Sequence, residues 1–557
     1  MTHRRNGSWA IVVALAILGL VASACQQGTA PTPQGAQADP NGELVVPLGA
    51  EPDTIDPQKE SFVDEVGQTM LVFDALMTFD PKTLKPVPSA AKDAPKISSD
   101  GLTYTFTLKD GGKYSDGQPV TAANFVYAFK RLCDPEVAGE SSFTGYIVKG
   151  CEAYNNADPK KSSPADLQKM RDAVGVRAVD NNTVEYTLNE KAPYFLSIAA
   201  LWVGVPSRED SVKKGGDKWT EPETFIGNGW YVLKEWKHNE KITYERNPNH
   251  VPLAKLKTIS KPIIAEASVA FAAYRNNEID IYGVGGEDRK VVEGDATLNK
   301  ELVKSGDSCT FYYGFNVTKP PFDDANARLG FARAFDREAY NRDINQGIGT
   351  ATASFMPPGF PNYDPDDQTQ KFDAAAAKQL IGQSKYASSM PKMTLSYSSS
   401  QRNKTRAEWA VGQWKQNLGL DIALDPQDRT TYTKNVKQAA TTPQIFLLGW
   451  CADYPDTQDW LTTVFHSTST VSHTGWKNTM FDTLTRQADA EPDAAKREQQ
   501  YKDAQRILTK DAPVAFLYSS AAWRLVKPWV QNYSLSSMDF FFSIFKLGDV
   551  FVTQKQK

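Results

Sequence analysis

Hydrophobic and polar residues follow strand and helix periods along most of the chain. They alternate strictly in Leu102–Leu108 and Thr183–Leu188, which predicts two half-buried strands. Apolar residues recur at helical spacing in Thr405–Leu418, and Gly419 ends that pattern. The same reasoning predicts strands at 43–48, 230–233, 242–245, 279–282, 310–316, 393–397, 421–424, 444–450, 514–518 and 523–526, and helices at 66–77, 122–132, 268–275, 325–335, 374–381, 480–490 and 494–508. Three of these helices have a residue suited to capping them at Thr121, Asp324 and Asp373. The mixture predicts an α/β fold with parallel and antiparallel strands.

One stretch combines a core strand with a polar end. The apolar run Ile445–Leu448 predicts a buried strand, and Gly449-Trp450-Cys451-Ala452-Asp453-Tyr454-Pro455 follows it. Our hypothesis is that Asp453 receives the α-ammonium of a peptide ligand while the strand before it pairs with the ligand's main chain. The alternative is that Asp453 begins a surface turn, and spacing alone favours that turn.

The N-terminus is typical of an exported lipoprotein. Arg4 and Arg5 precede an apolar segment, Trp9–Val21, that is too short to span a bilayer comfortably. The small residues before Cys25 resemble a bacterial lipobox, so residues 1–24 are predicted to be a signal peptide and Cys25 the lipidation site. Residues 25–42, rich in Gln, Pro, Gly and Ala, are predicted to be a flexible tether. The alternative is an ordinary secretory signal with an incidental cysteine.

Four cysteines remain for an oxidising compartment, at positions 133, 151, 309 and 451. They allow three pairings, and the sequence alone does not choose among them. Closeness in the chain favours Cys133 with Cys151, which would leave Cys309 with Cys451. A zinc site is the alternative, although no C-x-x-C spacing is present.

Composition and motifs narrow the possible functions. The 557 residues suffice for two or three domains, and a net charge of -4 gives no basic field for nucleic acid. The supply of 12 Trp, 22 Tyr and 27 Phe is large enough to line a ligand cleft as well as a core.

An exported hydrolase is an alternative function. None of the five histidines lies in H-E-x-x-H, and G-x-S-x-G is absent, so we predict no enzyme activity, metal or cofactor.

Several motifs, in order, resemble one family. The most specific is Asp100–Leu108 followed by Ser115–Ala122 and Phe125. The others are Gly227-Asn228-Gly229-Trp230-Tyr231, Glu245-Arg246-Asn247-Pro248, Lys319–Asp324, Ala334-Phe335-Asp336-Arg337 and Arg524–Trp529. Together they resemble the extracytoplasmic solute-binding proteins of peptide ABC transporters, family 5. The resemblance covers nearly the whole mature chain, and Gly449–Tyr454 is most similar to oligopeptide receptors.

The resemblance implies roles for individual residues. Asp453 would hold the ligand's ammonium group, and Trp450 and Tyr454 would shield that pair from water. Main-chain pairing with the ligand is implied for Gly449, Trp450 and Cys451, and a disulfide for Cys309 with Cys451. The opposite wall of the cleft would come from Ser61, Phe62 and Val63. Oligopeptide receptors tend to carry an arginine that helps to hold the ligand's C-terminus where this chain has Leu447.

The family also implies an architecture and partners. We expect a two-lobed, three-domain periplasmic-binding-protein-like fold of the class II type, with a hinge and an inserted small domain. The first lobe would combine 43–72, 203–308 and 521–557, the small domain would span 73–202, and the second lobe would span 309–520. The chain would be a monomer, anchored by its lipid to the outer face of the cytoplasmic membrane, in the periplasm or at the cell surface, where it would deliver oligopeptides to an ABC permease.

ATP hydrolysis would belong to separate subunits, because the chain has no G-x-x-x-x-G-K-[ST] motif. Fold does not fix the ligand, so a nickel chelate, haem, a sugar or a signalling peptide is the alternative cargo. A purely adhesive role is a further alternative for a surface lipoprotein.

Overall fold

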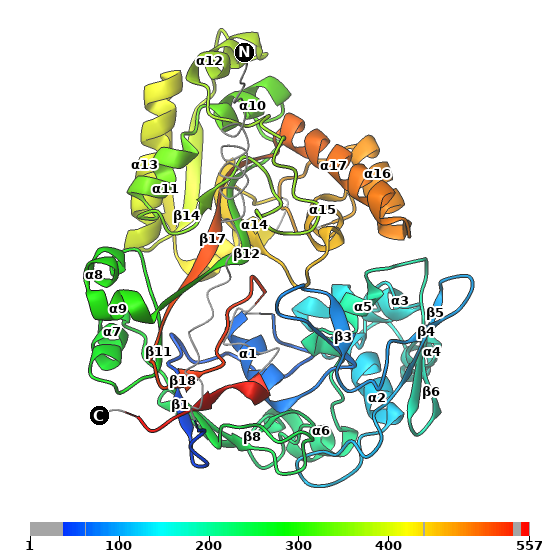
Figure 1. Ribbon diagram of the computed structural model, residues 1–557. Helices are drawn as coiled ribbons and strands as arrows, with labels where there is room; N and C mark the ends of the chain where they lie inside the picture. Colours follow the sequence, from blue (N-terminus) through cyan, green and yellow to red (C-terminus); the bar gives the residue numbers. More distant parts are fainter. Residues whose placement is uncertain (1–36, 62, 438–439, 470, 539–546, 556–557) are drawn as a thin grey trace, which may run out of the picture.

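Two lobes and a small domain divide the chain in space (Figure 1). The computed structural model describes residues 37–555, apart from 62, 438–439, 470 and 539–546. The expected Cys25 lipid site and the signal peptide lie outside the described residues, as does Phe62. Within the described part, no helix is both long enough and apolar enough to cross a membrane.

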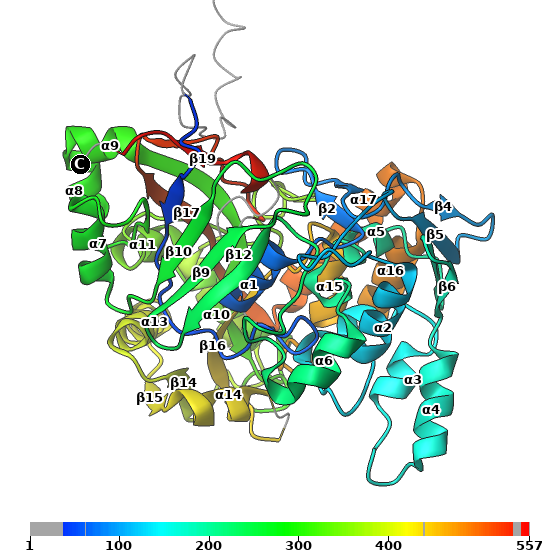
Figure 2. The same ribbon diagram turned by 90° about the horizontal axis from the view of Figure 1, so that it is seen from below.

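The first lobe is built on a four-stranded sheet. Its order is β1 (Glu43–Val45), β10 (Thr258–Pro262), β9 (Lys241–Arg246) and β8 (Tyr231–Lys237). β8 and β9 are antiparallel neighbours, as their alternating sequences predicted. Helix α1 (Val63–Val72) packs against this sheet (Figure 2). The chain around this lobe also forms α6 (Glu209–Gly215), α7 (Ala267–Arg275), α8 (Arg289–Gly294), α9 (Ala296–Glu301), β11 (Ile281–Gly283), β18 (Val530–Gln531) and β19 (Phe551–Val552).

The predicted helix at 66–77 is wrong at its C-terminal end. The helix stops at Val72, and the chain turns into the short strand β2 (Met77–Phe79), which pairs with β3 (Pro86–Pro88). Gly229 donates its main-chain N–H to the Val72 carbonyl at 2.8 Å, and a Cβ on Gly227 would lie 2.0 Å from that oxygen. A distant segment therefore ends this helix, and the local apolar pattern could not show it.

The small domain has its own sheet and core. The strand order is β4 (Lys96–Ile97), β5 (Thr103–Thr107), β7 (Thr183–Thr187) and β6 (Val176–Asp180). Helix α2 (Ala122–Leu132) covers it with an apolar side that includes Phe125, Ala128, Phe129 and Leu132. The Thr121 main-chain N–H donates to Asn124 Oδ1 at 2.9 Å at the start of α2, where the cap was predicted. The domain also contains α3 (Cys151–Asn155), α4 (Pro164–Ala173) and α5 (Phe195–Ile198).

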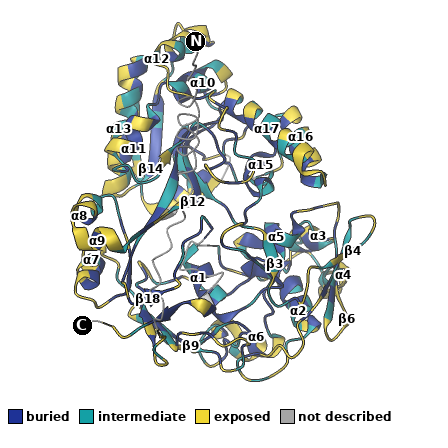
Figure 3. Ribbon diagram, in the orientation of Figure 1, coloured by how far each residue is buried: buried dark blue, intermediate teal, exposed yellow. Residues whose placement is uncertain are grey.

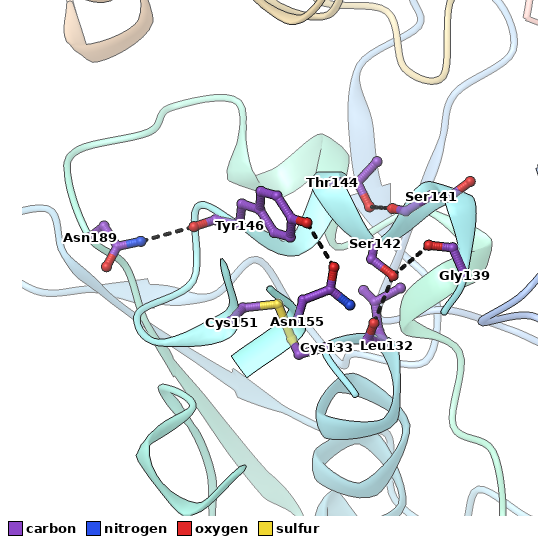
Figure 4. Close-up of a disulfide and its surroundings, with 10 residues drawn as sticks. All are labelled: Leu132, Cys133, Gly139, Ser141, Ser142, Thr144, Tyr146, Cys151, Asn155 and Asn189. Atoms are coloured by element: carbon purple, nitrogen blue, oxygen red, sulfur yellow. Dashed lines mark hydrogen bonds between the residues drawn. A yellow bond between two sulfur atoms is a disulfide. The ribbon is translucent and has the colours of Figure 1, made fainter. Parts of the chain in front are cut away.

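A disulfide joins Cys133, just after α2, to Cys151 at the start of α3 (Figure 4). The loop between them is further fixed by the Ser142 hydroxyl, which donates to the carbonyls of Leu132 at 2.9 Å and Gly139 at 2.7 Å. This pairing is the one favoured from the sequence. It holds in place the loop that carries Glu140.

The second lobe has a mixed sheet with helices on both sides (Figure 1). β16 (Ile445–Cys451) is antiparallel to β12 (Leu302–Phe315) and parallel to β14 (Met393–Ser398), which is parallel to β15 (Ile422–Gln427). Its helices are α10 (Ala325–Arg333), α11 (Arg337–Asp343), α12 (Ala374–Gln383), α13 (Gln401–Leu418), α14 (Arg429–Lys437), α15 (Thr457–Phe465), α16 (Thr479–Ala490) and α17 (Ala494–Asp511), and β13 (Thr350–Ala351) is a short edge strand. Figure 3 shows exposed residues on their outward faces, whereas the residues of the central strands are mostly buried or intermediate.

Three sequence signals in this lobe are confirmed. Asp324 accepts a hydrogen bond from Ala327 N at 3.1 Å, and Asp373 accepts one from Ala376 N at 2.9 Å, so both cap their helices. Gly419 follows α13 with a φ of +74°, the left-handed conformation that favours glycine.

β12 and β17 (Val514–Val526) are long antiparallel strands that run from one lobe to the other (Figure 1). The prediction of two strands at 514–518 and 523–526 is wrong, because the small and polar residues between them continue the ladder against β12 and β13. The β12–β17 register shifts between Gly306 and Thr310, which marks a β-bulge at the crossing between the lobes. The fold is the predicted mixed α/β, two-lobed arrangement.

Candidate ligand-binding site

β16 has an open edge over most of its length. All seven of its residues pair with β12, but β14 pairs only with Ile445 and Phe446. The Leu447 carbonyl accepts a hydrogen bond from the Tyr432 hydroxyl at 2.7 Å. Within the described residues no second strand is paired with the segment from Leu448 to Cys451. In an antiparallel ladder alternate residues direct their N–H and C=O groups away from the partner strand, so this edge can pair with another extended chain.

The open edge leads to two carboxylates. Asp453 follows β16 by two residues, and its main-chain N–H donates to Asp459 Oδ2 at 2.9 Å. Asp459, in the first turn of α15, is 0% exposed, and its Oδ1 has no hydrogen-bond partner among the described residues. No ion pair involves the Asp453 carboxylate within 4.0 Å in the described part of the chain. Two acidic groups thus lie together, and neither forms an ion pair with another residue that the structure describes.

Burial controls the ionisation of this pair. It raises the pKa of Asp453 from 3.8 to about 7, although the side chain keeps some solvent exposure. It also holds the pKa of Asp459 well above its ordinary value, and the neighbouring Asp453 charge raises it further. Such a site favours an incoming cation, because a positive partner offsets the cost of ionising a desolvated carboxylate.

Trp450 supports this arrangement. Its indole Nε1–H donates to Asp459 Oδ2 at 3.3 Å, the same oxygen that accepts from the Asp453 amide. Asp456 caps α15 and pairs with Arg497 through contacts of 2.7 and 2.9 Å, which fixes the start of the helix that carries Asp459. The turn after β16 is therefore held by several polar contacts.

Tyr454 has a position that the sequence did not reveal. It is 3% exposed, and its ring is stacked on Tyr194 of the small domain, with centroids 6.4 Å apart. Its hydroxyl donates to Gln458 Oε1 in α15. Tyr454 therefore joins the second lobe to the small domain beside Asp453.

Cys309 and Cys451 are directly opposite each other in the β12–β16 register and form a disulfide, with Cα atoms 3.9 Å apart. This is the second pairing expected from the sequence. It ties the end of β16 to the bulge in β12. Within the described residues no group of three or more His, Cys, Asp or Glu is arranged to hold a metal.

The loop of the predicted opposite wall is linked to the second lobe through Glu140 of the small domain. Ser61 donates its hydroxyl to Glu140 Oε2 at 3.0 Å and its main-chain N–H to Glu65 Oε2 at 3.0 Å. Lys437, at the end of α14, reaches Glu140 Oε1 at 3.2 Å. Val63 begins α1 and is partly buried. Ser61 of the first lobe, Glu140 of the small domain and Lys437 of the second lobe therefore form a bridge across the structure.

Three of these residues were missed from the sequence. Asp459 could have been found from the sequence. In Asp456-Thr457-Gln458-Asp459 a capping residue is followed by an acidic residue in the first turn, which is the pattern of a helix start. No local sequence pattern links Glu140 to Lys437, since 297 positions separate them. Leu447, where the resemblance suggested an arginine, is partly buried against the core of the second lobe.

Comparisons with known proteins agree with one another. A model of bacterial extracellular solute-binding proteins, family 5 (middle region), matches residues 85–472. The periplasmic oligopeptide-binding protein OppA of Salmonella typhimurium strain LT2 is 31% identical over 538 residues, covering 94% of this chain and 95% of that protein. The dipeptide-binding protein DppE of Bacillus subtilis strain 168 is 31% identical over 450 residues, covering 78% and 79%.

Solved structures show the same fold. Haemophilus influenzae OppA in complex with the peptide RPPGFSPFR superposes with a TM-score of 0.77 at 27% identity, and the match covers 93% of this chain and 100% of that one. The likeness therefore spans both lobes and the small domain.

Proposed function

The chain belongs to family 5 of the bacterial extracellular solute-binding proteins, and on that premise we propose that it captures oligopeptides outside the cytoplasm for an ABC importer. The observation that carries the proposal is the open edge of β16, which leads to Asp453, an acidic residue with no ion-pair partner among the described residues. Relatives named for oligopeptide and dipeptide binding support it.

Two interactions would hold the ligand. The peptide main chain would pair with Gly449, Trp450 and Cys451, which supplies affinity that does not depend on the peptide's side chains. The peptide's ammonium group would pair with Asp453, and this contact would lower the pKa of the carboxyl and favour its ionised form. Trp450 and Tyr454 would limit the access of water to the pair, which strengthens its electrostatic attraction.

Capture would involve movement of the lobes. We take the first lobe to be residues 43–72, 203–308 and 521–557, the small domain 73–202, and the second lobe 309–520. β12 and β17 are the strands that join the two lobes, and the bulge after Gly306 interrupts their ladder at the crossing. A bulge is a place where a strand pair can bend, so we assign the hinge there. Contacts of Lys437 with Glu140 and of Tyr454 with Tyr194 would form as the lobes close.

Delivery would need partners. An ABC permease would receive the closed form, and ATPase subunits on other chains would supply the energy. Cys25 would carry the lipid that holds this monomer at the outer face of the cytoplasmic membrane, with residues 25–42 as its tether. The protein would bind its cargo without chemical change to it, so no catalytic residue or cofactor is proposed.

Identification of the natural ligand tests this proposal. The mature chain would be purified without denaturation, its bound small molecules released and identified by mass spectrometry, and each candidate titrated back by calorimetry. We expect peptides with a free N-terminus. Recovery of a nickel chelate, haem or a sugar that binds tightly, together with no binding of any peptide, would overturn the peptide assignment. Hydrolysis of added peptides by the pure protein would overturn the assignment as a binding protein.

A further inference from the structure

A cavity lies where the first lobe meets the small domain. Its volume is about 550 Å³, which is within the range of small-molecule sites. Its walls come mainly from the end of α1, from β2, and from the segments 88–92, 108–113, 228–230 and 249–252. The lining residues that the structure describes all lie between Met70 and Pro252, outside the second lobe. The cavity is therefore separate from the open edge of β16.

Hydrogen bonds between the two domains hold the walls in place. The Asn228 side chain accepts from the main-chain N–H of Asp74 at 3.0 Å and donates to the Asp74 carbonyl at 3.1 Å. Asn249 Nδ2 donates to the Ser115 carbonyl at 2.9 Å, and the Ser115 N–H donates to the Gly227 carbonyl at 2.9 Å. The fold itself thus fixes the shape of the cavity, and a ligand would not have to organise it.

Much of the cavity wall is apolar. Met70, Val120 and Trp230 line it and are only partly buried. Val251, also in the wall, is 83% exposed. A ligand with an apolar body would gain free energy by covering these side chains, because it would remove their apolar surface from water.

The ionisable residues of the wall leave an excess of positive charge. Lys92 pairs with Asp110 at 3.1 Å, and His250 pairs with Asp74 at 3.0 Å. Within the described residues, the two remaining cations of the wall, Lys109 and Lys113, have no carboxylate within 4.0 Å. These two ammonium groups can therefore meet an anion that enters the cavity.

His250 neutralises the acidic side chain deeper in the wall. Its Nδ1 lies 2.7 Å from the Pro252 carbonyl oxygen and its Nε2 lies 3.0 Å from Asp74 Oδ2, so both ring nitrogens face acceptors and the ring must be protonated to satisfy both. Burial lowers the pKa of His250, but the hydrogen bond and the charge of Asp74 outweigh it and raise that pKa above its ordinary value. Asp74 is thus paired and does not repel an anion as a free carboxylate would.

We propose that this cavity is a second binding site, for a small amphipathic carboxylate whose apolar body lies against Met70, Val120 and Trp230 and whose carboxylate meets Lys109 and Lys113. A neutral apolar molecule would leave the two ammonium groups unused, and a small hydrophilic anion would leave the apolar wall uncovered. Because the site lies outside the second lobe, this binding goes beyond the capture of peptides at β16.

The test compares carboxylates with neutral molecules that have the same apolar body: octanoate with octanol, and 2-naphthoate with 2-naphthol. Calorimetry measures their binding to the full mature chain at about 50 and about 500 mM NaCl. We expect the carboxylate of at least one pair to bind at least five-fold more tightly than its neutral analogue at low salt. The preference should shrink at high salt, because salt screens exposed charges. Carboxylates that bind no more tightly than their analogues in both pairs, or no binding of any of the four, would overturn the inference.

Variants assign the preference to the cavity. Lys109→Gln with Lys113→Gln should remove most of the preference for the carboxylate and change the affinity for the neutral analogue less than two-fold. The matched control, Lys82→Gln with Lys96→Gln, removes two exposed lysines of the same domain outside the cavity wall and should keep the preference. An equal preference in the two double variants would place the carboxylate elsewhere and overturn the inference.

A cavity-filling variant tests the apolar part of the site. Val120→Trp should occupy the space and weaken the binding of carboxylate and neutral analogue alike by at least five-fold, and unchanged binding of both would overturn the inference. If this variant does not fold, the lysine variants at exposed positions still decide the question. The probes are not peptides, so failure of this inference leaves the proposed function untouched.

Discussion

The main-chain N–H of Asp453 donates to the carboxylate of Asp459 at 2.9 Å, so one buried acid positions the next at the open end of β16. Asp459 receives the Trp450 indole on the same oxygen. Hydrogen bonds thus fix the turn, and two acidic side chains lie close together in it. This relationship explains how a residue in a turn can act as a rigid anchor for a cation.

Replacing Asp459 by Asn tests what raises the pKa of Asp453. The amide oxygen can still accept from the Asp453 N–H, and burial is the cause that raises the pKa of the Asp453 carboxyl. Because the pKa of Asp459 is also held well above its ordinary value, Asp459 adds little negative charge when Asp453 ionises. We expect the pH midpoint of peptide affinity to change by less than about half a unit. Calorimetry across pH measures this midpoint. Asp482→Asn is the matched control in the same lobe, and a fall of about one unit or more in Asp459→Asn alone would contradict burial as the cause.

Peptide affinity should depend on pH in a bell-shaped way. Ligand-free Asp453 has a pKa raised to about 7, so affinity should rise with pH up to that value. Above pH 8 it should fall again, because the peptide's α-ammonium, with an ordinary pKa of about 7.7–8.0, loses its proton. Binding titrations from pH 5 to pH 9 measure the profile. A flat profile would show that no ionised pair forms.

The same carboxyl should leave a signature in ligand-free stability. Its folded-state pKa is above the ordinary value of 3.8, so the stability that it contributes is fully present below that pH and is lost as pH rises through about 7. Asp453→Asn does not titrate and should therefore gain in melting temperature over wild type between pH 5 and pH 8. A difference that stays constant over this range would argue against a raised pKa.

The Cys309–Cys451 disulfide should matter for binding as well as for stability. Changing both residues to Ser should lower the free energy of unfolding by about 2–4 kcal/mol and weaken peptide affinity, because the end of β16 is no longer tied to β12. The matched control changes Cys133 and Cys151, which lie in the small domain. That control should lose stability but lose less peptide affinity, because it loosens the loop that carries Glu140 and leaves β16 tied to β12. Denaturant unfolding and calorimetry separate the two effects, and equal losses of affinity would remove the special role of Cys309–Cys451.

The sequence predicted the strand, the acidic residue after it and the starts of several helices, because these depend on local patterns. Asp324 and Asp373 cap the helices before which they stand, and Gly419 ends α13. Local patterns also identified Gly449 to Cys451 as the end of a core strand.

Features that depend on distant segments could not be predicted. The α1 helix ends where Gly229 contacts Val72, and β17 continues through small residues because β12 and β13 pair with it. The open edge of β16 exists because β14 pairs with only its first two residues. The sequences of the two strands do not show this offset.

The central claim is that Asp453 pairs with the ammonium group of a bound peptide. The most direct measurement is a calorimetric cycle with wild type and Asp453→Asn, each titrated with an identified peptide ligand and with its N-acetylated form. We predict that acetylation weakens binding to wild type about 100-fold or more, that Asp453→Asn weakens binding of the free peptide to a similar degree, and that acetylation then costs the variant little. Binding of the free peptide by Asp453→Asn at wild-type affinity, with the same penalty for acetylation in both proteins, would contradict the claim.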